Sequence, residues 1–261
     1  MAFTVHAVMP GVWHIVDCMG VCMTLLEGEN AAMLVDTGYG IEDVADFMRH
    51  MTDLPLTVFL THNHHDHAMG ARCFPETYML EADMADWRMF TNDEMRRRVL
   101  TQAIGKNLPV DEKTFLAGEI PLPKVMKPGV IDLGGLTAEI IEAPGHTPGS
   151  AVVYVPERKL LLSGDDWNPC TWLFFPQALG LREYRSNMRG IQQLPFEKVL
   201  CPHREALYDR WMFDDFFNAL TDGNLRAAEP VNIAPYEQID TCQATLPHDQ
   251  VLVFDWAKSE L

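Results

Sequence analysis

Thr61-His62-Asn63-His64-His65-Asp66-His67 is a run that holds four histidines and one aspartate within six residues. Neutral imidazoles and a carboxylate are good ligands for Zn²⁺, Fe²⁺ or Mn²⁺. A cluster this dense has little other physical use, because buried polar rings need partners and exposed rings do not need to gather. The competing interpretation is a solvated histidine-rich turn. We interpret the run as the centre of a metal site.

The residues on either side of the run predict its place in a fold. Residues 56–60 are mostly apolar and β-prone, and Pro55 marks a point where a strand can begin. Gly70 follows the histidines. We therefore expect the histidines on a loop at the carboxyl end of a buried strand, where open α/β folds place their sites.

Composition limits the classes of partner. The chain has 261 residues, 48% of them hydrophobic and 22% charged, which is ordinary for a globular protein. A formal net charge of −17 repels phosphate backbones, so we expect no nucleic-acid partner and predict a small-molecule substrate. The basic run Arg96-Arg97-Arg98 is interpreted as the solvated face of a helix.

The amino-terminal residues and the cysteines predict a cytoplasmic protein. The first residues have no basic segment followed by a long apolar one, and no stretch of about 20 apolar residues occurs, so we expect neither a signal peptide nor a membrane partner. The six cysteines are scattered, which predicts free thiols. A redox pair of Cys18 and Cys22 is the less favoured alternative.

The strand and helix patterns repeat in the two halves of the chain. Each half shows several short strands, then a helix, then a further strand, which predicts two sheets packed face to face with helices outside. We expect one α/β domain spanning residues 1–261. The expected strands are 4–9, 11–17, 22–27, 31–36 and 56–60, then 129–133, 136–143, 150–155, 159–163, 198–200 and 250–256; the expected helices are 41–51 and 181–193.

Residues 81–128, between the halves, predict a helical insert. The segment is rich in helix formers and includes Met84, Met89 and Met95. Core packing of the insert is the favoured role of these methionines. The alternatives are a lid over the site and an interface for a homodimer.

Three later segments place further metal-binding side chains at expected strand ends. His146 lies in a loop stiffened by proline and glycine, Asp165 follows an apolar strand, and His203 follows another. A lone histidine on a loop is usually a surface residue. Three such strand-end positions that can converge on one rim favour a shared site.

Taken together, these motifs resemble the metallo-β-lactamase fold superfamily. Its THxHxDH hallmark matches Thr61 to His67, and its later histidine, aspartate and histidine match the three strand-end residues in order. Its early aspartate after a strand matches Asp36. The resemblance covers about residues 11–203 and implies a four-layer αβ/βα sandwich with a two-metal site at one edge.

The resemblance also implies a role for each matched residue. His62, His64 and His146 would bind the first metal, whereas Asp66, His67 and His203 would bind the second and Asp165 would bridge both. Asp36 would orient a ligand ring, and Thr61 would have a similar role. Two divalent ions are expected, with Zn²⁺ favoured and Mn²⁺ or Fe²⁺ as alternatives. Asp166, beside the bridging aspartate, has the alternative role of a proton shuttle.

The implied reaction is hydrolysis of an ester, thioester or lactone by a bridging hydroxide, with Asp66 as the catalytic residue. A true β-lactamase is disfavoured because that class normally has cysteine or serine where Asp165 stands. The alternatives are a mononuclear iron oxidoreductase similar to persulfide dioxygenases and a small-molecule phosphodiesterase.

An aromatic segment after the bridging aspartate suggests a substrate pocket. Trp167, Trp172 and Phe174 are predicted to form an apolar wall for an acyl substrate. A loop that covers the core is an equally supported interpretation. Tyr184, at the start of the next expected helix, is the candidate hydrogen-bond donor to an oxyanion.

Overall fold

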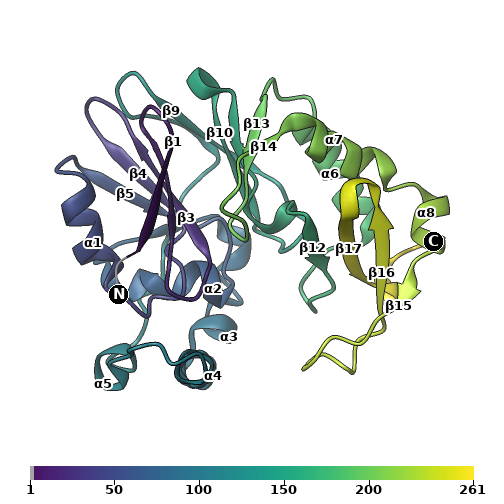
Figure 1. Ribbon diagram of the computed structural model, residues 1–261, viewed down its shortest axis with the longest axis horizontal. Helices are drawn as coiled ribbons and strands as arrows, with labels where there is room; N and C mark the ends of the chain where they lie inside the picture. Colours follow the sequence, from purple (N-terminus) through teal and green to yellow (C-terminus); the bar gives the residue numbers. More distant parts are fainter. Residues whose placement is uncertain (1–2) are drawn as a thin grey trace.

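The computed structural model describes residues 3–261 and contains a first sheet of seven strands (Figure 1). Strands β1 to β4 pair antiparallel in sequence order, and β4 to β7 pair in parallel. The strands are β1 (Thr4–Met9), β2 (Val12–Val16), β3 (Cys22–Glu27), β4 (Ala32–Val35), β5 (Leu56–Phe59), β6 (Tyr78–Met79) and β7 (Lys124–Val125).

A second sheet of six strands comes from the later part of the chain. Its order is β14-β13-β11-β10-β9-β8, and its one parallel pair is β11 with β13. The strands are β8 (Gly129–Asp132), β9 (Thr137–Glu142), β10 (Ala151–Val155), β11 (Leu160–Leu162), β13 (Lys198–Leu200) and β14 (Tyr208–Asp209). The predicted two-sheet arrangement is therefore confirmed.

Alternating side chains of buried strands divide between two cores. In β4, Met33 and Val35 pack between the two sheets, whereas Ala32 and Leu34 pack on the opposite face. All four are buried because both faces of the strand are covered, which explains the continuous apolar run. Each fully buried large side chain of this kind contributes roughly 1.5–3 kcal/mol.

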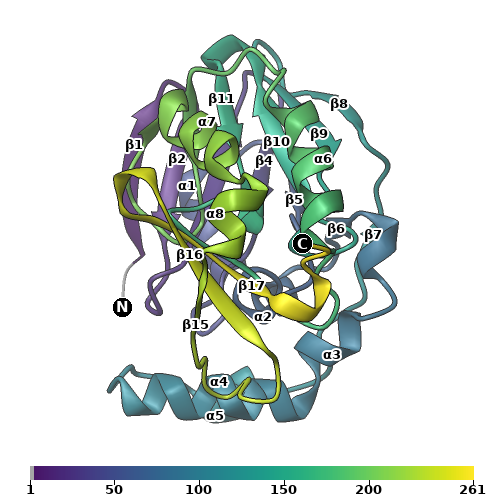
Figure 2. The same cartoon turned by 90° about the vertical axis from the view of Figure 1, so that its right-hand side faces the viewer.

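Helices cover the outer faces of both sheets. Helix α1 (Val44–Met51) packs Val44 and Met48 against the first sheet, and the Asp43 side chain caps it by accepting from the Asp46 backbone N–H. Helices α6 (Leu181–Ile191) and α7 (Arg210–Ala219) cover the second sheet, and a short α8 (Asp222–Arg226) follows (Figures 1 and 2). The order of layers is helix, sheet, sheet, helix.

A third sheet departs from the prediction. Its order is β12-β17-β16-β15, with β12 (Cys170–Leu173), β15 (Glu229–Pro230), β16 (Thr241–Leu246) and β17 (Gln250–Asp255). Strand β17 was expected as a closing strand, but it pairs with β12 and β16 beyond α6 and α7. The aromatic segment after Asp165 therefore includes a strand, because partners about 80 residues later in the chain complete its hydrogen bonds.

The segment between β6 and β7, where an insert was expected, forms helices and is called the insert below. It contains α3 (Trp87–Thr91), α4 (Asp93–Gly105) and α5 (Glu112–Phe115), packed around a core that it shares with the end of β5, with the segment that holds the histidines and with β6. Met84 and Met95 pack against that core, whereas Met89 is half exposed. Arg96 is buried and donates to the backbone carbonyls of the α5 region, so it is not part of a solvated face.

Short helical segments complete the chain. They are α2 (His65–Ala68) and the 3₁₀ segments Met69–Cys73, Glu81–Asp83, Pro156–Arg158, Gly164–Asp166, Pro247–Asp249 and Trp256–Lys258. All six cysteines are free thiols, as predicted. Within residues 3–261, no helix is both long and apolar enough to cross a membrane.

Candidate metal centre

The sequence-predicted ligands meet where strands of both sheets end. The histidine run follows β5, and α2 begins within it at His65. His146 lies between β9 and β10, Asp165 follows β11, and His203 follows β13. Because β4 and β5 run in parallel, as do β11 and β13, each pair delivers its following loops to one edge of its sheet.

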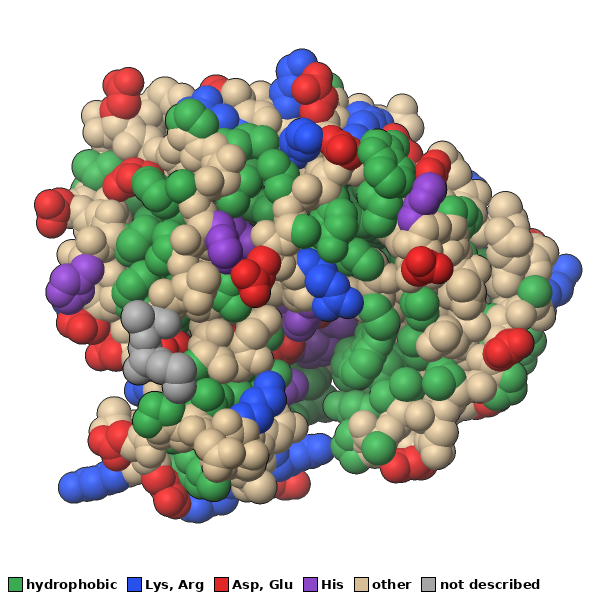
Figure 3. All heavy atoms as spheres, in the orientation of Figure 1, with side chains coloured by type: hydrophobic (Ala, Val, Ile, Leu, Met, Phe, Trp, Pro, Cys, Tyr) green, Lys and Arg blue, Asp and Glu red, His purple; other side chains and the backbone are tan. Residues whose placement is uncertain are grey.

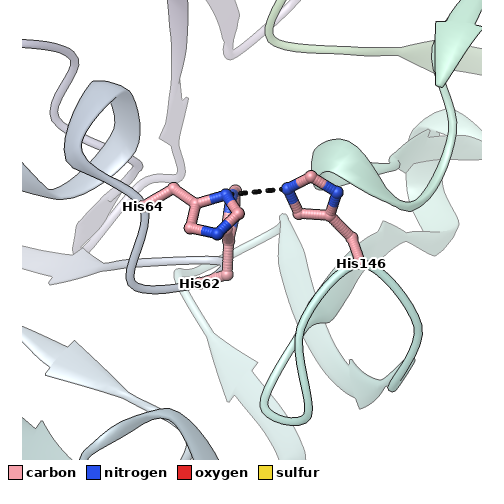
Figure 4. Close-up of side chains that lie close together, drawn as sticks. All are labelled: His62, His64 and His146. Atoms are coloured by element: carbon pink, nitrogen blue, oxygen red, sulfur yellow. Dashed lines mark hydrogen bonds between the residues drawn. The ribbon is translucent and has the colours of Figure 1, made fainter. Parts of the chain in front are cut away.

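A first triad is formed by His62, His64 and His146. All three are buried, and their candidate ligand nitrogens lie within 4.8 Å of one another. Nδ1 of His64 and Nε2 of His146 are 2.8 Å apart, and Figure 4 shows the rings approaching from opposite segments of the chain. Three imidazoles that converge in this way could hold one divalent ion.

A second triad is formed by Asp66, His67 and His203, whose ligand atoms again lie within 4.8 Å of one another. Asp165 lies between the triads. Its Oδ2 is 3.5 Å from Nε2 of His146, 3.5 Å from Nε2 of His67 and 3.0 Å from Nε2 of His203. One carboxylate oxygen therefore faces ligand atoms of both triads.

The chemistry of these atoms fits divalent cations. Nε2 of His62, Nε2 of His67 and Oδ1 of Asp165 are buried and have no hydrogen-bond partner within residues 3–261. Buried polar atoms without partners are costly, and a cation between them would satisfy their lone pairs. Burial and the neighbouring histidines hold the pKa of His62 and of His64 well below the usual range, which keeps both rings neutral.

His67 has the opposite electrostatic environment. Burial opposes its charge, but the carboxylates of Asp165, Asp66 and Asp36 outweigh burial and raise its pKa well above the usual range. The carboxylates thus create a position that attracts positive charge. A metal ion there would displace the proton, because metal binding requires a neutral imidazole.

Hydrogen bonds to the far nitrogens orient the rings. Nδ1 of His67 donates to Oδ2 of Asp36 over 3.0 Å. The Thr61 hydroxyl donates to Asp36 and lies 3.0 Å from Nδ1 of His62, from which it accepts. Nδ1 of His146 donates to the Trp172 carbonyl over 2.6 Å. In each ring Nε2 is left facing the triads, which is how partners of metal-binding histidines fix the tautomer.

Gln177 was missed by the sequence reasoning. Its side-chain amide lies 2.7 Å from Nε2 of His64, and its Oε1 is buried without a partner within residues 3–261. Rotating the Gln177 amide by half a turn exchanges its nitrogen and oxygen, so that Oε1 accepts from the Nε2–H of His64. Nδ1 of His64 then carries no proton and faces the first triad. Nothing in the sequence near Gln177 signals this contact.

A protein-family model described as the metallo-beta-lactamase superfamily matches residues 16–203, well over half of the chain. This chain belongs to the metallo-beta-lactamase superfamily. The superfamily match and the histidine–aspartate clusters together indicate that it binds divalent metal.

Several known proteins are similar to this superfamily member. Acyl-coenzyme A thioesterase MBLAC2 from Gallus gallus is 26% identical over 200 residues, covering 69% of this chain and 70% of the relative. The metallo-beta-lactamase family protein TTHA1429 from Thermus thermophilus has a TM-score of 0.60 at 19% identity, covering 85% of this chain and 82% of that chain. TTHA1623, solved in a di-iron-bound form, has a TM-score of 0.53 at 21% identity, covering 76% of this chain and 94% of that chain.

A cavity of about 490 Å³ opens onto the metal centre of this metallo-beta-lactamase superfamily member. Figure 3 shows histidine side chains deep in a surface hollow with hydrophobic side chains along one side. Besides candidate ligands, side chains from three regions line it: Tyr39 and His65; Phe90, Met95, Arg98, Val99 and Gln102 of the insert; and Asn168, Cys170, Trp172, Phe175, Arg204 and residues 234–236.

The predicted pocket residues are only partly in place. Trp172 lines the cavity, but Trp167, Phe174 and Tyr184 are buried in the core and do not. The Trp167 indole donates to Oε1 of Gln250 in the third sheet. The Tyr184 hydroxyl donates to the Asp166 backbone carbonyl, so it is not directed at a substrate. The Trp167 and Tyr184 rings pack against Phe213 and Phe217 of α7, and the Phe174 ring packs against Tyr236, so none of the three side chains reaches the cavity.

Two buried carboxylates support the loops that carry the ligands. Oδ1 of Asp166 accepts from the His146 backbone N–H over 2.9 Å, and Asp166 does not line the cavity. Asp83, in the insert, accepts from the Asn63 N–H, the Thr147 hydroxyl and the Gly149 N–H. The insert is thereby tied to both loops that supply the first triad.

Proposed function

We propose that the chain is a hydrolase that holds two divalent ions, one at each triad, and cleaves an acyl ester, thioester or lactone. The observation that carries this proposal is the position of Oδ2 of Asp165 within 3.5 Å of ligand nitrogens from both triads, at the base of a cavity with apolar walls. The thioesterase activity named for MBLAC2 favours a thioester among the three substrates. Zn²⁺ is the favoured metal, and the di-iron form of TTHA1623 supports iron as an alternative.

The metal ligands proposed are His62, His64 and His146 for one ion and Asp66, His67 and His203 for the other, with Asp165 shared. When bound, such ions supply Lewis acidity, which acidifies water and polarises a carbonyl oxygen. The chain supplies orientation of the ligand rings through Asp36, Thr61 and the Trp172 carbonyl. It also supplies a cavity that holds the substrate's acyl group against apolar side chains.

Asp66 is proposed as the catalytic carboxylate. It lines the cavity and is partly exposed to it. Burial opposes its ionisation, but His67, His65 and His203 outweigh burial and lower its pKa to about 2. It is therefore an ionised acceptor at neutral pH that can orient water by accepting a hydrogen bond.

Tyr39 replaces Tyr184 as the proposed donor to the substrate oxygen. It lines the cavity, and its ring packs edge-on against His65 with centroids 5.5 Å apart. Its backbone N–H donates to Asp17, whose other oxygen accepts three further backbone N–H groups. Burial and the Asp66 carboxylate raise the pKa of Tyr39 above its usual value, so the hydroxyl keeps its proton.

The test combines metal content with a substrate panel. Protein purified without chelators or a histidine tag is expected to contain about two metal ions per chain and to hydrolyse octanoyl thioesters and p-nitrophenyl octanoate. Asp66→Ala should abolish turnover with an unchanged circular dichroism spectrum, whereas the control Asp215→Ala, at an exposed position paired with His248, should retain it. One iron per chain with oxygen uptake on a thiol persulfide, or turnover of bis(p-nitrophenyl) phosphate alone, would contradict the proposal.

A further inference from the structure

One face of α4 forms a wall of the cavity. Relative to Met95, the residues Arg98, Val99 and Gln102 lie three, four and seven positions later, which places all four on the same side of the helix. Three of these side chains are neutral, and Arg98 brings a positive charge to this wall.

A second arginine enters the same cavity from the opposite sheet. Arg204 directly follows His203, and its backbone carbonyl accepts from Nε2 of His14 over 3.1 Å. Nδ1 of His14 lies 3.0 Å from the Thr24 hydroxyl, which donates to it when Nε2 carries the proton. The loop with Arg204 is therefore held by a buried histidine of β2.

Neither arginine is neutralised by a carboxylate, although one N–H of the Arg204 guanidinium donates to the His203 backbone carbonyl over 2.8 Å. Neighbouring charges are paired elsewhere: Arg96 with Asp93, and Glu205 with His6 over 2.8 Å. Within residues 3–261, Arg98 and Arg204 form no ion pair with a carboxylate of the chain. Apart from the proposed ligands, they are the charged side chains that line the cavity, in a protein with a net charge of −17.

The apolar part of the cavity adjoins the first triad. Phe90 and Phe175 lie on the ring of His64, with centroid distances of 4.4 and 4.8 Å. Tyr236 packs edge-on against Phe175 at 5.4 Å, and Trp172 lies 6.2 Å from the same ring. An alkyl chain placed here would contact aromatic side chains while its carbonyl group remains next to the ligands.

We propose that Arg98 and Arg204 bind an anionic group of the substrate, so that the substrate is an acyl thioester whose thiol portion carries phosphate or carboxylate groups. The acyl chain lies on the aromatic side chains, and the anionic thiol portion lies against the two guanidinium groups. Guanidinium groups bind either anion through paired, charge-assisted hydrogen bonds. This inference rests on the proposed hydrolase function, since the thioester bond must lie at the metal centre.

A binding experiment tests the arginines without turnover. Metal-free protein is titrated calorimetrically with adenosine 3′,5′-bisphosphate, which represents a phosphate-bearing thiol, and separately with S-methylglutathione, which represents a carboxylate-bearing thiol. One of the two probes is expected to bind, more weakly at higher salt. Arg98→Gln and Arg204→Gln should each weaken its binding about fivefold or more. Arg97→Gln, at the exposed neighbouring position on α4, is the matched control and should bind as the wild type does.

A kinetic experiment on the metal-loaded enzyme separates the two proposals. The substrates are octanoyl-coenzyme A, S-octanoylglutathione and the neutral S-octanoyl-N-acetylcysteamine. Both arginine variants should lower kcat/KM about fivefold or more for one anionic thioester and leave the neutral one unchanged. Hydrolysis of all three with equal kcat/KM in every variant would overturn the arginine proposal alone. Absence of hydrolysis with intact probe binding would overturn the hydrolase function alone, and absence of probe binding would overturn the arginine proposal.

Discussion

The Asp36 carboxylate accepts a hydrogen bond from Nδ1 of His67, and the two atoms are 3.0 Å apart in a fully buried environment. The same carboxylate accepts from the Thr61 N–H and hydroxyl. Through these contacts Asp36 determines which nitrogen of His67 faces the second triad and, through Thr61, which nitrogen of His62 faces the first. A residue outside the ligand set thus orients one ligand of each triad.

Replacing Asp36 should weaken metal binding. Asp36 has a φ of 65°, a left-handed conformation that glycine adopts without strain, so Asp36→Gly removes the carboxylate with little backbone cost. We expect a 10- to 100-fold loss in affinity for Zn²⁺, measured by competition with a chromophoric chelator. Asp46→Ala, on the exposed surface of α1, is the control. Unchanged affinity in Asp36→Gly would show that the ligands are oriented without this carboxylate.

Two tyrosine variants distinguish the cavity from the core. Tyr39→Phe should reduce kcat on the order of 10²-fold, because the proposed donor to the substrate oxygen is lost. Tyr184→Phe should leave kcat within about twofold and reduce the free energy of unfolding by ~1 kcal/mol, because its hydroxyl donates only to the Asp166 carbonyl. Steady-state kinetics and urea denaturation of both variants provide the comparison. A larger effect on kcat in Tyr184→Phe than in Tyr39→Phe would reverse these roles.

Two tryptophan variants test the apolar wall. Trp172 and Trp256 are both 37% exposed, but only Trp172 lines the cavity. Trp172→Ala keeps the backbone carbonyl that accepts from His146 and removes the indole, so KM should rise about tenfold for octanoyl esters and little for acetyl esters. Trp256→Ala should change neither KM. Equal increases for the two acyl lengths in Trp172→Ala would indicate a structural role of the indole.

Asp83 predicts a pH dependence of stability. Burial raises its pKa to about 6, whereas an unfolded aspartate titrates near 3.9. The folded state therefore favours the protonated Asp83 side chain. What this protonated side chain contributes to the free energy of unfolding is fully present below about pH 4 and is lost as pH rises to about 6. The loss amounts to at most ~3 kcal/mol.

The measurement is the free energy of unfolding of metal-free protein between pH 4 and 7. Wild type should lose stability relative to Asp83→Asn across this range, and the difference should become constant above about pH 6.5. Asp53→Asn, at an exposed site, is expected to parallel the wild type at every pH. A constant difference between wild type and Asp83→Asn from pH 4 upward would contradict the raised pKa.

Local patterns predicted most of the two main sheets. Strands β3 and β4 are short, mostly apolar segments bounded by turn-forming residues, so their predicted bounds differ little from the observed ones. The third sheet was not predicted because β12 is short and pairs with β17, which lies far along the chain. Strand β17 was expected as a strand, but the hydrogen bonds that it forms with a distant segment leave no pattern from which this pairing could be predicted.

The sequence by itself determined the superfamily and the candidate ligands, because closely spaced histidines and strand-end aspartates have few physical uses other than metal binding. A homodimer and a cytoplasmic location remain predictions from it. Only the tertiary structure decided which side chains face the substrate. It buried Trp167 and Tyr184 against aromatic side chains of α7 and Phe174 beneath neighbouring aromatic rings, and it brought Arg98, Phe90 and Tyr236 to the cavity from the insert and from a loop near the end of the chain. Ligand chemistry is encoded in residue type and short spacing, whereas exposure depends on which elements pack together.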